Sequence, residues 1–162
     1  AIGLEMGNYT TANYRWFDLI VPRAHANVSS LKMCFKRLRF KLDDVDTTDP
    51  SLDNDNVDFD LGEVTLSSTG TYLGEVVIPA GTYKRIEFDL ESDCVSGNSL
   101  ELTNDNGSYT SNERITIKFS GLFEANVDGT LNLGVQTILN QLNNHNGAVS
   151  LKQSAEAASG DL

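Results

Sequence analysis

Residues 37–42 alternate strictly between basic and apolar side chains, and this alternation constrains the fold more than any other feature of the chain. The apolar members are Leu38, Phe40 and Leu42, and the basic members are Arg37, Arg39 and Lys41. A period of two is typical of a β-strand with one buried and one exposed face. Met33 and Phe35 lie out of phase with this series, which predicts a β-bulge near Lys36.

Seven further segments are rich in β-branched and aromatic residues and are separated by turn-forming residues, as expected of short strands. They are residues 57–66, 71–78, 83–90, 99–103, 108–110, 114–124 and 130–133. Only residues 135–142 have helical spacing, through Val135, Ile138, Leu139 and Leu142. The sequence therefore predicts an all-β, antiparallel β-sandwich of about seven to eight strands with one short C-terminal helix. A parallel sheet would need crossover helices, which this pattern does not predict.

The length of 162 residues fits one domain with a hydrophobic core of its own. We assign the β-sandwich domain to residues 27–149. Residues 1–26 are expected to form an N-terminal extension or the first strand, and residues 150–162 a polar C-terminal tail.

One pairing register follows from the charges and the cysteines. We expect residues 34–42 to pair antiparallel with residues 86–94. The pairs would be Leu38 with Leu90, Phe40 with Phe88, Leu42 with Ile86, Arg37 with Glu91, Arg39 with Asp89, and Lys41 with Glu87. Each opposite-charge pair across two strands contributes about 0.2–1 kcal/mol, so three such pairs favour this register over its neighbours.

The same register places Cys34 opposite Cys94. A disulfide between them would mean that the protein matures in an oxidising compartment, outside the cytoplasm. The alternative is that both cysteines remain free thiols, buried as small hydrophobic side chains.

Charge and composition argue against several classes of function. The net charge of −11 would repel a polyanion, so we expect no nucleic-acid partner. No apolar run approaches the roughly 18 residues of a membrane-spanning helix. The two histidines, His25 and His145, lie in no catalytic motif and are expected to be solvated loop residues. We therefore expect no enzymatic activity.

The acidic stretch at residues 43–56 is the strongest chemical candidate. Asp53, Asp55 and Asp58 offer carboxylates near alternating positions, and calcium prefers several oxygen ligands. The stretch lacks the glycine and the closing glutamate of a helix-loop-helix calcium loop. The stretch therefore forms either a calcium site of another kind or a solvated, self-repelling loop. Apart from calcium, the sequence predicts no cofactor.

The segment LGEVVIPAGTYKRI, residues 73–86, contains the motif IPAGxY. It resembles an uncharacterised family of bacterial and archaeal lipoprotein-type domains, and the resemblance extends over about residues 28–133. It implies a β-sandwich at the cell surface or in the envelope, with a lipid anchor that would lie upstream of Ala1. Within the motif, Pro79 should end one strand and the Tyr83 hydroxyl should reach back to brace the turn.

Two functional hypotheses follow. The first is a structural or adhesive cell-surface protein that assembles with itself or with other surface proteins through an N-terminal strand. That strand would be formed by Trp16, Phe17, Leu19, Ile20 and Val21, unless the segment is the first strand of its own domain. The second is a surface-anchored binding module for a carbohydrate, a peptide or calcium. Its candidate aromatic contacts are Tyr9, Tyr14, Trp16, Tyr72 and Tyr109.

Overall fold

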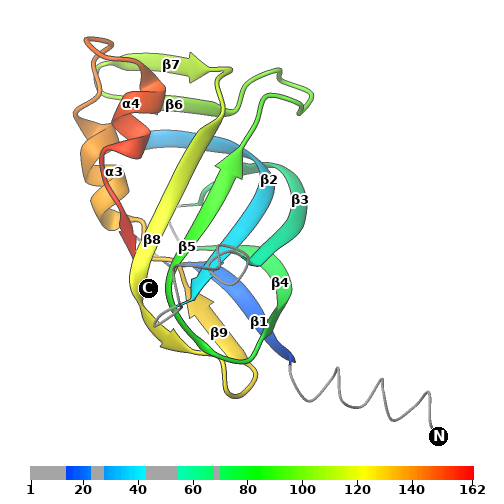
Figure 1. Cartoon of the computed structure of the whole chain (residues 1–162). Coiled ribbons are helices and arrows are strands. Elements are labelled where there is room, and N and C mark those ends of the chain that lie inside the picture. The colour runs from blue at the N-terminus through cyan, green and yellow to red at the C-terminus, as the bar shows by residue number, and fades with distance from the viewer. Residues whose placement is uncertain (1–13, 23–27, 43–54, 68–69) are drawn as a thin grey trace, which may run out of the picture.

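The computed structural model describes residues 14–22, 28–42, 55–67 and 70–162. These residues form two β-sheets and two short helices (Figure 1). The strands are β1 (Tyr14–Val21), β2 (Val28–Leu42), β3 (Asp55–Thr65), β4 (Thr71–Pro79), β5 (Thr82–Leu90), β6 (Leu100–Asn104), β7 (Gly107–Ser111), β8 (Ile115–Glu124), β9 (Gly129–Asn132) and β10 (Gly160–Asp161). The helices are α3 (Gln136–Asn143) and α4 (Leu151–Glu156). The predicted all-β sandwich is confirmed.

The smaller sheet has the strand order β4-β1-β9. Its central strand β1 pairs antiparallel with β4 and parallel with β9. The apolar segment around Trp16 is therefore the first strand of its own domain, and both of its edges are occupied by strands of the same chain.

The larger sheet is organised around β2, the longest strand of the structure. One edge of β2 pairs with β3, while its other edge pairs first with β6 and then with β5. Since β5 ends opposite Phe35 and β6 begins opposite Met33, these two strands form one line along β2. The loop of residues 91–99 interrupts that line. β8 and β10 extend the sheet beyond β5, and β7 extends it beyond β6.

The predicted pairing of β2 with β5 is confirmed, but its register is wrong by two residues. Leu38 lies opposite Phe88, Phe40 opposite Ile86 and Arg39 opposite Glu87. An even shift keeps every side chain on its expected face, so the apolar and charged sides are as predicted. The register prediction required Cys94 to lie on the paired strand, whereas β5 already ends at Leu90. The predicted bulge is present, between Phe35 and Arg37.

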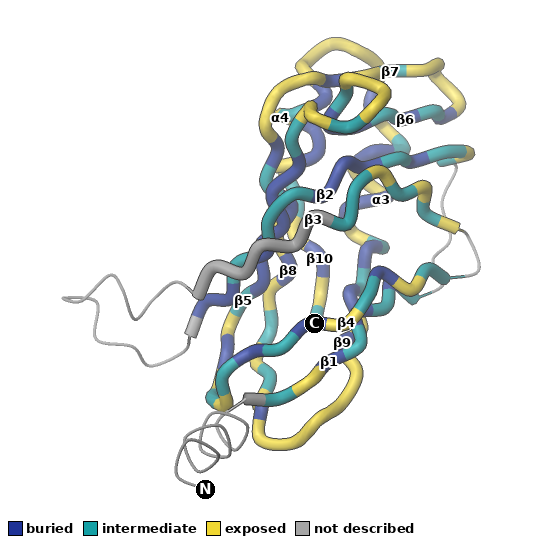
Figure 2. Tube along the Cα trace, turned by 90° about the vertical axis from the view of Figure 1, so that its right-hand side faces the viewer, coloured by how far each residue is buried: buried dark blue, intermediate teal, exposed yellow. Residues whose placement is uncertain are grey.

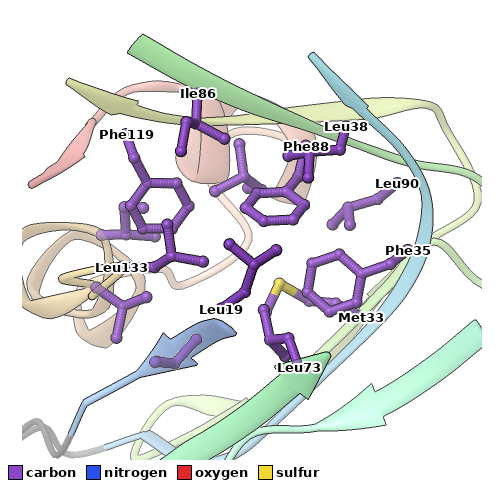
Figure 3. Close-up of a cluster of buried hydrophobic side chains, with 14 of the residues drawn as sticks. Leu19, Met33, Phe35, Leu38, Leu73, Ile86, Phe88, Leu90, Phe119 and Leu133 are labelled. Atoms are coloured by element: carbon purple, nitrogen blue, oxygen red, sulfur yellow. The ribbon is translucent and has the colours of Figure 1, made fainter. Parts of the chain in front are cut away.

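The core lies between the two sheets. Leu19 from β1 and Leu73 from β4 point toward Phe35 of β2 and Phe88 of β5 (Figure 3). Aromatic rings meet edge to face, with centroids 5.2 Å apart for the pair Phe35 and Phe88. Such contacts add about 0.5–1.5 kcal/mol beyond the burial of apolar area.

The C-terminal residues fold onto the sandwich and do not form a separate polar tail. The predicted helix is α3, and it buries Ile138, Leu139 and Leu142 as the spacing indicates. A second helix, α4, which the sequence analysis did not predict, begins after Ser150, whose side chain accepts a hydrogen bond from the backbone N–H of Gln153. The two helices lie together beside β6, β7 and β8 (Figure 1).

The last strand links the two sheets. β10 pairs parallel with β8, and on its other side Asp161 forms two backbone hydrogen bonds with Gly134, at 2.7 and 2.9 Å. Gly134 lies two residues beyond the end of β9, which belongs to the smaller sheet. The segment after α4 thus closes the sandwich along this edge.

Candidate functional site

The outward side of the smaller sheet carries the most distinctive exposed side chains of the described structure. Phe17, Leu19 and Val21 of β1 are buried, so the alternate residues of this strand point away from the core. We call this side the outer face. It comprises Trp16, Asp18 and Ile20 of β1, Tyr72, Glu75 and Val77 of β4, and Thr130 and Asn132 of β9. In Figure 2 the three strands lie next to one another.

Two aromatic side chains dominate the outer face. Trp16 is 48% exposed and Tyr72 is 60% exposed. Among the side chains that the structure describes, no other aromatic residue is as exposed. Large exposed rings are uncommon on a soluble domain without a partner, and aromatic residues are enriched where proteins bind ligands.

The residues of β1 and β4 form three cross-strand pairs on this face. Trp16 lies opposite Val77, Asp18 opposite Glu75, and Ile20 opposite Tyr72. An acidic pair is therefore flanked on both sides along the strands by a pair that contains one aromatic and one aliphatic residue. Thr130 lies beside Asp18 on the β9 side and adds an exposed hydroxyl.

Hydrogen bonds fix part of this arrangement. The Tyr72 hydroxyl donates to Asp18 Oδ1 at 3.0 Å, which ties the Tyr72 side chain to Asp18. This bond, together with the nearby charges of Asp18 and Glu75, raises the pKa of the Tyr72 phenol above its usual value. At the other end, the backbone N–H of Trp16 donates to Asp128 Oδ1 at 2.9 Å, which ties β1 to the turn before β9.

Only part of the outer face was predicted from the sequence. Trp16 and Tyr72 were expected as candidate aromatic contacts, whereas Asp18 and Glu75 were not. Asp18 occurs at an outward position between Trp16 and Ile20, and the alternation in β1 was the available signal. The pairing of Asp18 with Glu75 depends on a long-range register with a bulge between Leu19 and Ile20, which no local pattern indicates.

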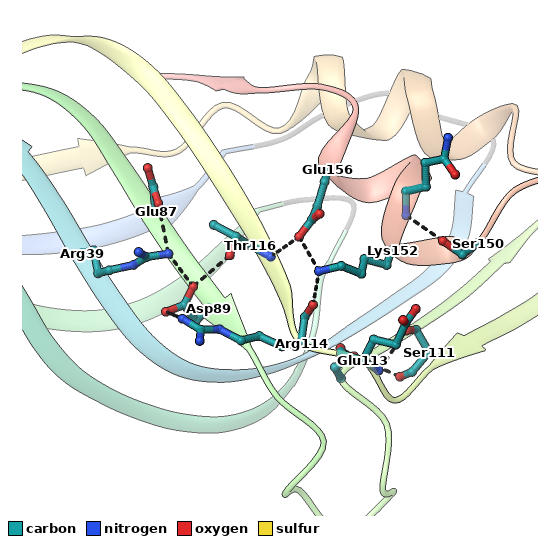
Figure 4. Close-up of polar contacts among 12 residues, drawn as sticks. Arg39, Glu87, Asp89, Ser111, Glu113, Arg114, Thr116, Ser150, Lys152 and Glu156 are labelled. Carbon is teal, nitrogen blue, oxygen red and sulfur yellow. Dashed lines mark hydrogen bonds and ion pairs between the residues drawn. The ribbon is translucent and has the colours of Figure 1, made fainter.

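A second polar cluster lies on the larger sheet, and its geometry is that of a structural network. Asp89 is fully buried, and Arg39 and Arg114 each donate a 2.8 Å hydrogen bond to it while Thr116 donates one at 3.0 Å (Figure 4). Arg39 also pairs with Glu87, at 3.1 Å. These contacts satisfy both oxygens of Asp89 and cross-link β2, β5 and β8, so no ligand is needed to account for the buried charge.

His145 and Ser154 form another buried contact. The imidazole Nδ1 lies 2.7 Å from the Ser154 hydroxyl oxygen, and the two residues are only 5% and 4% exposed. The expectation that His145 is a solvated loop residue is therefore wrong. Its backbone carbonyl accepts a hydrogen bond from the buried Asn104 side chain, and burial lowers the pKa of its imidazole. The pair joins α4, which contains Ser154, to the loop that follows α3.

The predicted disulfide between Cys34 and Cys94 is present. It connects β2 with the loop of residues 91–99, at the point along β2 where the pairing partner changes from β5 to β6. Lys36 forms a salt bridge with Asp93 beside the disulfide, and this salt bridge lowers the pKa of the Asp93 carboxyl. A disulfide is consistent with an oxidising, extracytoplasmic setting.

The side chains of the three candidate calcium ligands all lie outside the described part of the structure. Asp53 lies outside the described residues. Asp55 and Asp58 belong to β3, with backbone positions opposite Phe40 and Arg37. Asp58 was expected in a strand, whereas residues 55–56 of the acidic stretch were expected in a loop and belong to the strand as well. The calcium site itself stays a prediction.

The interior offers little room for a ligand. An apolar cavity of about 20 Å³ lies between the sheets, and a groove of about 140 Å³ opens beside it between β1, β2 and α3. Sites for small organic ligands are larger, about 300–1,000 Å³. Both of these spaces are therefore smaller than such a site.

Comparison with known proteins gives no relative: no family model, no curated protein and no solved structure matches the chain. Within the described residues, no helix has the length and apolar character needed to cross a membrane.

Proposed function

We propose that this chain is a non-catalytic, extracytoplasmic adhesive or binding module, and that the outer face of the β4-β1-β9 sheet is its recognition surface. The observation that carries the proposal is the placement of Trp16 and Tyr72, which are exposed on one side of one sheet. Aromatic side chains on a rigid strand bind with a small loss of conformational entropy, because their positions are fixed before the ligand arrives.

Three further features support this proposal. The Cys34–Cys94 disulfide fits a protein that works outside the cytoplasm. The buried groups that could resemble catalytic machinery, Asp89 and His145, both have structural partners within the fold. The strand β1 pairs with β4 along its whole length on one edge and with β9 through residues 17–20 on the other. Because strands of the same chain cover most of both edges of β1, adhesion is better explained by the outer face than by donation of the strand to a neighbouring subunit.

A printed array of glycans and peptides tests this function. We expect the wild-type chain to be retained by a restricted set of spots and the Trp16→Ala and Tyr72→Ala variants to lose that retention. Leu122→Ala is the matched control, since Leu122 is 69% exposed but belongs to β8 of the larger sheet. Retention that is equal in the three variants would place recognition elsewhere, and the absence of any retained spot would argue against a binding module.

A further inference from the structure

We infer that the ligand of the outer face is an extended peptide that presents basic side chains, Lys or Arg, to the acidic pair Asp18 and Glu75. This inference rests on the proposed function, because it assigns a ligand class to the same surface. It follows from the charges and the order of side chains along β1 and β4.

The acidic pair of the outer face favours a positively charged ligand. Asp18 and Glu75 are direct cross-strand partners on the exposed side of the sheet, so their Cβ atoms are about 5 Å apart. Like charges in this position destabilise a sheet. A cation between the two carboxylates would remove this repulsion and gain two charge-assisted hydrogen bonds. A basic ligand would thus offset the unfavourable interaction between the side chains of Asp18 and Glu75.

The rings beside the acidic pair also suit a basic side chain. Trp16 and Tyr72 lie one pair away from the carboxylates in opposite directions along the strands. An ammonium or guanidinium group over an aromatic ring gains about 0.5–1 kcal/mol at an exposed site. The aliphatic stem of Lys or Arg can at the same time cover the apolar side chains Ile20 and Val77.

The size of the surface favours a peptide over a single small cation. Trp16 and Ile20 are four residues apart on β1, which corresponds to about 13 Å along a strand. An extended peptide of about four residues spans this length. Thr130 and Asn132 of β9 are exposed beside it and can hydrogen-bond to a peptide backbone. The net charge of −11 would also attract a basic partner over longer distances.

Two other ligand classes fit less well. A neutral sugar could stack on Trp16 or Tyr72, but it would leave the charges of Asp18 and Glu75 uncompensated. Calcium needs six to eight oxygen ligands, and two carboxylates on a flat sheet supply few of them.

Trp16 is the only tryptophan of the chain, so its fluorescence reports directly on this site. The experiment titrates the full chain with a ten-residue peptide of alternating Gly and Arg. Peptides in which Glu or Gln replaces Arg, a neutral cellulose oligosaccharide and calcium chloride serve as comparison probes. We expect the Arg peptide alone to change the emission, with an affinity that falls as salt is added.

The decisive variant is the double substitution Asp18→Asn, Glu75→Gln. It should weaken binding of the Arg peptide by about tenfold, the loss expected for two exposed charge contacts. It also removes a like-charge repulsion, so the variant should fold at least as well as the wild type, which circular dichroism checks. Asp105→Asn, an exposed carboxylate in the β6–β7 turn, is the matched control and should leave the affinity unchanged.

The possible results distinguish an error in the ligand class from an error in the proposed function. An Arg peptide that binds the double variant as tightly as the wild type would overturn the ligand assignment. A response to the oligosaccharide or to calcium in place of the Arg peptide would also overturn it, while the proposed recognition face would stand. A Trp16 emission that no probe changes would contradict both the ligand class and, with an empty array, the proposed function.

Discussion

The hydroxyl of Tyr83 donates a 2.6 Å hydrogen bond to the backbone carbonyl of Pro79, four residues earlier in the chain. Pro79 ends β4 in the smaller sheet, and Tyr83 lies at the start of β5 in the larger one. The bond therefore fixes the corner at which the chain passes from one sheet to the other. Beside it, Gly81 and Ala125 exchange two backbone hydrogen bonds, so the later passage from β8 to β9 is joined to the same corner.

Tyr83→Phe should lower the free energy of unfolding by about 1–2 kcal/mol, because the carbonyl of Pro79 loses its donor in a partly buried place. Tyr109→Phe is the matched control. The Tyr109 hydroxyl also bonds to a carbonyl nearby in the chain, that of Asn106, but its surroundings are exposed and water can replace it. Urea denaturation of both variants measures the difference. Equal losses would mean that the corner does not depend on this bond.

Reduction or removal of the disulfide should destabilise the fold without changing its topology. Cys34 and Cys94 are 60 residues apart, and a disulfide that closes a loop of this length stabilises a protein by about 2–4 kcal/mol. The double variant Cys34→Ser, Cys94→Ser should lose this amount in urea denaturation. Its β-sheet circular dichroism should be retained, since the core residues between the sheets are unchanged. A midpoint equal to that of the wild type would show that the loop of residues 91–99 does not need the disulfide.

Gly160 should not tolerate a side chain. A Cβ atom at this position would overlap with the carbonyl oxygen of Gly134 and with the ring of Phe119. We expect Gly160→Ala to displace β10 and to cost about 1–3 kcal/mol, as overpacking does elsewhere. The neighbouring exposed Ser159 supplies the control, Ser159→Ala. Hydrogen exchange of the Asp161 and Leu162 amides would rise in the first variant only, and unchanged protection in both would contradict the tight fit of β10.

His145 should make stability depend on pH near neutrality. Burial lowers the pKa of its imidazole in the folded state, so below the unfolded value of about 6.5 the unfolded chain binds more protons. The contribution of the neutral imidazole is therefore fully present above that pH and is lost as the pH falls below it. Unfolding free energies measured from pH 8 to pH 5.5 should fall less steeply in His145→Gln than in the wild type. Parallel curves would show that His145 does not titrate differently on folding.

The local patterns of the sequence predicted those parts of the fold that depend on neighbours along the chain. The alternation around Phe40, the helix through Ile138 and the brace of Tyr83 on Pro79 are all confirmed. The disulfide was predicted correctly although the register that suggested it was two residues off, since Cys94 reaches Cys34 from a loop.

The features that the sequence did not predict depend on long-range contacts. The C-terminal residues look polar and small, yet Leu151 and Ala155 are enough to pack α4, and Gly160 fits only because Gly134 and Phe119 lie close to it. His145 was expected in solvent because its neighbours are polar, whereas Asn104 and Ser154 satisfy its buried groups. The acidic pair of the outer face arises in the same way, from the long-range register between β1 and β4.

A two-dimensional amide NMR titration of the full chain with the alternating Gly-Arg peptide would show directly whether the outer face binds a basic peptide. We expect the shift changes to be concentrated in β1, β4 and β9, with the Trp16 indole and the amides of Asp18 and Glu75 among the largest. Changes centred on β5 and β8, around Asp89 and Arg114, would contradict it, as would a spectrum that the peptide leaves unchanged.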